Sequence, residues 1–76
     1  MADEKGGKQM AAFLIKKGDY LSGLAVTHAQ SAEHEKAKKL YLQAASWYKK
    51  AGAEEKKKGA ISLAREQASL EQEADK

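Results

Sequence analysis

The first residues in this chain that suggest chemistry are its two histidines, His28 and His34, which lie close to Glu33 and Glu35. Metal ligands on one helix favour spacings of three or four, because those positions share a face. A spacing of six places the two imidazoles on nearly opposite sides. The pattern therefore predicts neither a metal site nor an acid–base pair here.

A second candidate is the glycine-rich stretch Gly6-Gly7-Lys8-Gln9 near the N-terminus. A phosphate-binding loop needs an earlier glycine, a Ser or Thr after the lysine, and a preceding strand. All three are missing from this stretch, and the sequence offers no nucleophile beside a base. We therefore expect a non-enzymatic protein without a cofactor.

Lysine is the remaining chemistry-bearing residue, and it is unevenly distributed. Eight lysines fall between Lys36 and Lys58, whereas the segment from Glu66 to Asp75 carries four acids and no base; the net charge is +3. A basic middle could contact phosphates. Base reading relies on arginine, and Arg65 is the sole arginine. Non-specific nucleic-acid binding is therefore kept as an alternative function.

The chain length and the composition limit the size of the fold and indicate its cellular compartment. Seventy-six residues make one small domain. The absence of cysteine excludes disulfides and suits a reducing cytoplasm, which is the expected location. No apolar run reaches the roughly 18 residues that a spanning helix needs, so we expect no membrane insertion. Because the core of a small domain provides little stability, we keep a homodimer as an alternative to a monomer.

The composition predicts an all-α fold, since proline is absent and β-branched residues are few. We expect a disordered leader over residues 1–7 and a single domain over residues 8–75. Within the domain the spacing of apolar residues predicts four helices, as antiparallel hairpins. Their ranges are 8–17, 20–31, 35–51 and 54–73.

Glycines and one acid predict where these helices end and begin. Gly18 is expected to stop the first helix, and Asp19 to cap the second by accepting from backbone N–H groups. Gly52 is expected to stop the third helix in the left-handed conformation. Between residues 31 and 34 the sequence fits a tight turn, which we favour, or a fusion of the second and third helices. A fusion would leave three helices and a swapped dimer.

A repeated pattern links two parts of the chain. Residues 9–18 match residues 43–52, which lie 34 positions later: Gly18 falls on Gly52 and Phe13 on Trp47. A period of this length is typical of helix–turn–helix repeats. Such repeats bind other proteins.

With the glycines aligned, the pattern resembles the tetratricopeptide repeat. The residues from Lys16 to Tyr20 look like the turn between that family's two helices, and Ala11 and Ala45 occupy its small position. The resemblance covers roughly residues 5–70. It implies helical hairpins that bind a short peptide in a groove.

A second resemblance is to MIT domains, three-helix modules of microtubule-interacting and membrane-trafficking proteins. It rests on the spacing of Leu40-Tyr41, Ala44, Tyr48 and Ala51, preceded by a turn over residues 32–37. This resemblance covers residues 20–75 and implies an adaptor that binds an amphipathic tail helix.

In the repeat register the partner-binding groove is basic, which favours a short acidic peptide. Trp47 lies off the centre of its apolar stripe and is the candidate aromatic anchor. The expected partner-binding residues share a position on the first helix of each hairpin: Lys8, Ala12, Lys16, Lys39, Ser46, Trp47, Lys49 and Lys50, with Ile15 and Leu42 also on the groove.

Overall fold

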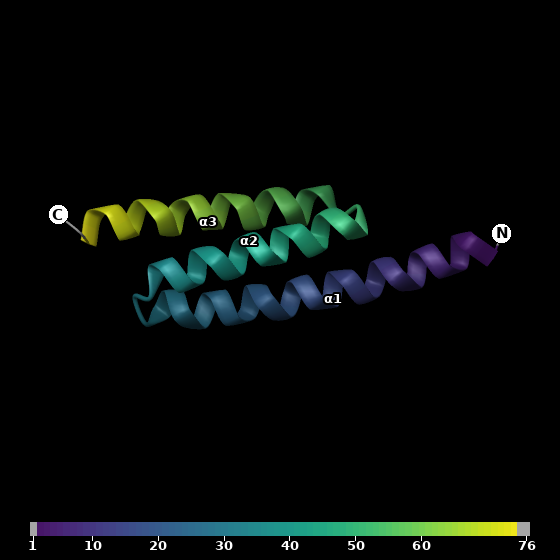
Figure 1. Ribbon diagram of the computed structural model, residues 1–76, viewed down its shortest axis with the longest axis horizontal. Coiled ribbons are helices and arrows are strands. Elements are labelled where there is room, and N and C mark those ends of the chain that lie inside the picture. The colour runs from purple at the N-terminus through teal and green to yellow at the C-terminus, as the bar shows by residue number, and fades with distance from the viewer. Residues whose placement is uncertain (1, 75–76) are drawn as a thin grey trace.

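The computed structural model describes the backbone of residues 2–74 and the side chains of residues 9–73. It contains three helices, α1 (Ala2–Gln30), α2 (His34–Ala51) and α3 (Glu54–Ala74), and the described residues include no strand. The predicted all-α class is confirmed, in its three-helix form. Figure 1 shows the helices as antiparallel neighbours in chain order.

Helix α2 is the central element of the arrangement. It packs along both α1 and α3, whereas α1 and α3 make only marginal contact with each other. The N-terminal part of α1 continues past the turn between α2 and α3 (Figure 1). The molecule is therefore an open layer of helices around α2, and its two helix pairs can be considered as two hairpins.

Gly18 does not end a helix, so its predicted role as a stop is wrong. Helix α1 runs through it without a break, and the two helices expected over residues 8–17 and 20–31 are one. A Cβ at this position would lie 2.5 Å from Cε1 of Tyr48. The missing side chain of Gly18 thus makes room for the Tyr48 ring, which packs directly against the α1 backbone.

Asp19 is likewise not a helix cap. The hydroxyl of Tyr48 on α2 donates a hydrogen bond to its Oδ1, and Nζ of Lys56 on α3 lies 3.2 Å from the same oxygen. The Tyr48 hydrogen bond, joined by that of Lys56 and its charge, lowers the pKa of the Asp19 carboxyl against the opposing effect of burial. One carboxylate therefore links all three helices.

The turn at residues 31–33 is confirmed, and both turns use one backbone pattern. In the first, Glu33 N–H donates to His28 O and Ala32 N–H to Ala29 O; Ala32 takes the left-handed conformation with φ of 59°. This is the Schellman arrangement that closes many helices.

The second turn repeats that pattern with a glycine. Ala53 N–H donates to Tyr48 O and Gly52 N–H to Lys49 O. Gly52 takes φ of 73°, which confirms its predicted left-handed stop. The two turns therefore differ in the residue that adopts the left-handed conformation.

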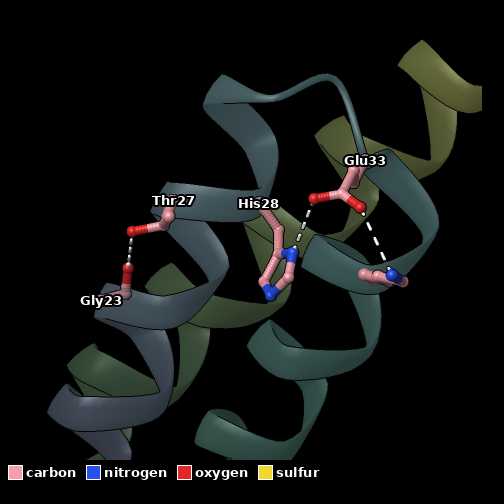
Figure 2. Close-up of polar contacts among 5 residues, drawn as sticks. Gly23, Thr27, His28 and Glu33 are labelled. Atoms are coloured by element: carbon pink, nitrogen blue, oxygen red, sulfur yellow. Dashed lines mark hydrogen bonds and ion pairs between the residues drawn. The ribbon is translucent and has the colours of Figure 1, made fainter.

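Side chains add a clamp to the first turn (Figure 2). His28 Nδ1 lies 2.9 Å from Oε1 of Glu33, and Lys36 Nζ lies 3.3 Å from its Oε2. The hydrogen bond from His28, followed by that from Lys36, lowers the pKa of the Glu33 carboxyl.

In the last turns of α1, Thr27 Oγ1 donates to the carbonyl oxygen of Gly23 at 3.3 Å.

The core is built mainly from alanines and two tyrosines. Small side chains at the helix contacts let the backbones approach closely. Burial raises the pKa of Tyr41, and Glu66 adds to this effect. The buried apolar residues are Ala25, Ala37, Tyr41, Ala44, Ala45, Tyr48, Ala60 and Ala64.

The predicted domain limits stay a prediction. Helix α1 begins at Ala2, so it includes most of residues 1–7, for which we expected a disordered leader. Met1 and residues 75–76 lie outside the described residues.

Candidate functional site

The described surface is hollowed between α2 and α3, where an open groove of about 340 Å³ runs along the two helices. Ala64 forms part of its buried floor, and the leucine and isoleucine on its sides stay partly accessible. The lining comprises Lys38 and Leu42 of α2 together with Ile61, Ala64, Arg65 and Ala68 of α3.

The groove forms because the α3 face is made of small and medium side chains. Ile61, Ala64 and Ala68 follow the i, i+3, i+7 spacing of one helix face. Alanine leaves the space beside α2 empty where a leucine would fill it. From Ile61 to Ala68 the groove follows about 10 Å of helix. That length suits about two turns of a bound peptide helix.

Two cations border this apolar floor. Arg65 is exposed, and Lys38 is half-buried with its Nζ 3.7 Å from Oε2 of Glu71. Lys49 lies seven residues after Leu42 and shares its side of α2 by helical spacing. The groove is therefore apolar inside and mainly basic at its margin.

A partly buried hydrogen bond links the two helices at one end of the groove. His34 Nδ1 lies 2.7 Å from Oε1 of Gln67, and Gln67 is buried. An amide oxygen accepts, so the imidazole Nδ1–H donates. This bond holds α2 and α3 in register one turn before Lys38.

The partner-binding residues expected on α1 do not meet those expected on α2. Ala12 and Lys16 are exposed on α1, and Lys8 lies on α1 where side chains are not described. Neither Ala12 nor Lys16 lines the α2–α3 groove. Their role in binding stays a prediction.

The expected residues of α2 are mostly exposed. Lys39 Nζ lies 3.6 Å from Oε1 of Glu35, and Ser46 and Lys49 are exposed. Trp47 is half-buried, with Lys50 Nζ 4.8 Å from its ring centroid. Among the expected groove residues whose side chains are described, Leu42 is the one that lines the observed groove.

Sequence reasoning missed Lys38, Ile61, Ala64, Arg65 and Ala68 as groove residues. The signal was present, because Ile61, Ala64, Arg65 and Ala68 follow the i, i+3, i+4, i+7 spacing. From the sequence, the apolar spacing in this segment was used only to predict a helix over residues 54–73. The groove could be placed only once α3 was known to leave this face uncovered.

Two further features bear on chemistry. Among the described residues, no three His, Cys, Asp or Glu side chains gather in a way that could hold a metal ion. None of the described helices has both the length and the apolar character needed to cross a bilayer.

The fold and groove define the class of this protein as an open three-helix all-α domain. No known protein-family model matches the chain, and no curated protein or solved structure matches it either.

Proposed function

We propose that this protein is a non-enzymatic interaction module that holds a short, acidic, amphipathic peptide helix in the α2–α3 groove. The observation that carries the proposal is the groove itself, with an apolar floor and cations at its margin. Amphipathic helices bind such grooves through apolar residues spaced by three or four.

Charge supports an acidic peptide over a basic one. Lys38 and Arg65 border the groove, and Lys38 already pairs with a carboxylate of α3, Glu71. A glutamate or aspartate of the peptide would replace that intramolecular partner. Complementary charge of this kind selects partners and speeds association.

The three-helix arrangement is compatible with both resemblances. A three-helix module that binds a tail helix is what the MIT resemblance implies. A helix–turn–helix repeat that binds an extended peptide is what the tetratricopeptide resemblance implies. The apolar floor between two helices favours binding of an amphipathic helix in the groove, and hence an MIT-like adaptor.

The test uses a fluorescent synthetic peptide whose leucines follow the i, i+4, i+7 spacing and whose flanks are glutamates. We expect micromolar binding by fluorescence anisotropy, since a groove of this size buries a small interface. A version with lysine flanks should bind at least about tenfold more weakly, because Lys38 and Arg65 repel it.

A matched pair of variants places the binding site. Leu42 and Leu63 are 48% and 40% exposed, but only Leu42 lines the groove. Leu42→Glu should reduce affinity more than about tenfold, by removing apolar contact and adding a repelling charge. Leu63→Glu should leave it unchanged. Equal effects of both variants, or binding of neither peptide, would refute the proposal.

Nucleic-acid binding, the alternative from the lysine-rich middle, is tested in the same assay. Lys56 pairs with Asp19 and Lys57 with Glu54, which leaves fewer cations for phosphates. A labelled oligonucleotide should show no binding near 0.15 M salt. Tight binding that falls linearly with log salt would favour the alternative.

A further inference from the structure

A line of exposed apolar side chains runs along α1. Met10, Phe13 and Tyr20 are 57%, 53% and 66% exposed, and Leu24 is half-buried. These residues and Lys17 are spaced by three or four along the helix, so they form one stripe about 21 Å long. We call this stripe the α1 edge.

The α1 edge differs from the other exposed apolar residues that are described. Val26, Leu42 and Leu63 each stand on a separate helix face or helix. Scattered single apolar residues are normal on a protein surface, whereas a continuous patch marks an interaction site. The α1 edge is such a patch, and the α2–α3 groove lies elsewhere.

Cations accompany the aromatic residues of the α1 edge. Lys16 and Lys17 both lie between Phe13 and Tyr20 in the sequence, and Lys17 Nζ is 5.7 Å from the Phe13 ring centroid. Both lysines are exposed. Aromatic rings beside lysine ammonium groups are typical of protein segments at a membrane–water interface.

Carboxylates are absent from this edge. Between residues 9 and 30 the sole acid is Asp19, and its Oδ1 is bound by Tyr48 and Lys56 on the side where α1 meets α2 and α3. The α1 edge therefore presents apolar side chains and positive charge without an opposing negative charge.

We infer that the α1 edge binds the surface of an anionic lipid bilayer. Met10, Phe13 and Tyr20 enter the headgroup region, and Lys16 and Lys17 contact lipid phosphates. The attachment is peripheral, so no part of the α1 edge crosses the bilayer. It goes beyond the proposed peptide binding and uses a different surface of the molecule.

The shape and charge of the edge favour a bilayer over other occupants. A second copy would bring two lysine-bearing edges of like charge together. Stacking of nucleic-acid bases needs free ring faces, and Lys17 lies over the face of Phe13. Helix α1 lies at the margin of the layer (Figure 1). A bilayer surface can therefore cover the α1 edge along its length.

The test is co-sedimentation with vesicles of phosphatidylcholine alone and of phosphatidylcholine with phosphatidylserine. We expect binding to the anionic vesicles only, and weaker binding at high salt. Phe13→Glu should reduce the partition coefficient more than about tenfold. Val26→Glu is the matched control: Val26 is an apolar residue of α1, 44% exposed, outside the edge. It should leave binding unchanged.

The charge component is measured with a second variant. Replacing both Lys16 and Lys17 by alanine should reduce binding about 25-fold, since each lysine near an anionic surface contributes about fivefold. Circular dichroism of each variant shows that the helices remain formed.

Four outcomes would overturn the inference. The first is equal loss of binding in Phe13→Glu and Val26→Glu. The second is no binding to anionic vesicles at low salt. The third is a doubled mass in sedimentation that Phe13→Glu abolishes, which would assign the edge to a second copy. Binding of a labelled oligonucleotide that Phe13→Glu abolishes would equally assign it to nucleic acid.

Discussion

The two hairpins that share α2 differ in how they are closed. Between α1 and α2, Gly18 receives the Tyr48 ring, and the hydroxyl of that ring reaches Asp19. Between α2 and α3, Ala64 and Ala68 leave an open groove. The α1–α2 hairpin is closely packed, whereas the α2–α3 hairpin leaves apolar surface accessible. The two sides of α2 therefore differ in packing: the α1 side is filled by the Tyr48 ring, and the α3 side leaves apolar side chains accessible beside its buried contacts.

The largest expected effect comes from opening the α1–α2 hairpin. In Gly18→Ala the new Cβ would lie 2.5 Å from the Tyr48 ring, which is buried and held by Asp19. The overlap destabilises the folded state, and the better helix propensity of alanine offsets only part of that effect. We expect the free energy of unfolding to fall by about 1–2 kcal/mol. Urea unfolding followed by circular dichroism measures it.

The control for that variant is on the same helix. A Cβ at Gly23 would meet nothing within 4 Å. Gly23→Ala should therefore stabilise the protein by about 0.5–1 kcal/mol. Glycine-to-alanine substitution should therefore lower the free energy of unfolding at position 18 and raise it at position 23. A lower free energy of unfolding in both variants would contradict a close contact specific to Gly18.

The hydroxyl of Tyr48 should have the next largest effect. Tyr48→Phe removes its hydrogen bond to Asp19 and a 3.3 Å contact with Ser22 Oγ. We expect a loss of about 1–2 kcal/mol, since the Tyr48 hydroxyl donates to a charged carboxylate. Tyr20→Phe, at an exposed position on α1, should change stability by less than about 0.5 kcal/mol. Similar thermal unfolding midpoints for the two variants would contradict the predicted role of the Tyr48 hydroxyl.

The two turns offer a smaller, paired test. Ala32 adopts the left-handed conformation with φ of 59°, as Gly52 does with φ of 73°. A side chain in that conformation is strained by about 1 kcal/mol. Ala32→Gly should therefore raise the unfolding free energy slightly, and Gly52→Ala should lower it by about 1 kcal/mol. Thermal unfolding measures the change in stability of both variants. Stabilisation of both variants, or destabilisation of both, would contradict the shared backbone pattern.

The smallest expected effect is on acid stability. Tyr48 and Lys56 lower the pKa of Asp19, so the folded state binds fewer protons than the unfolded chain in acid. This contribution is complete above the usual carboxyl pKa of 3.8 and is lost as pH falls through the lowered value. Asp19→Asn should flatten the decline in stability below about pH 4. An unchanged slope would show that other carboxylates dominate.

Much of the fold follows from local sequence. The apolar stripe of α2, the left-handed Gly52 and the extent of α3 were all predictable, because each depends on residues within one helix or turn. The joining of residues 8–17 to 20–31 was not. Gly18 and Gly52 occupy equivalent places in a repeated pattern, yet only Gly52 ends a helix.

The physical reason lies outside the local pattern. Gly18 is surrounded by good helix formers and faces the Tyr48 ring, which is distant in sequence. Conversely, Ala32 ends α1 with a residue that rarely adopts the left-handed conformation, so the turn carried no clear glycine signal. The groove was missed for a related reason, since its existence depends on how α3 lies against α2.

The central claim, that the α2–α3 groove holds an acidic amphipathic helix, is tested most directly by titrating the leucine–glutamate peptide into isotope-labelled protein and following backbone amide signals. We predict that the largest shifts fall on Lys38, Leu42, Ile61, Arg65 and Ala68, with α1 nearly unaffected. Largest shifts along α1, or none on any helix at saturating peptide, would contradict it.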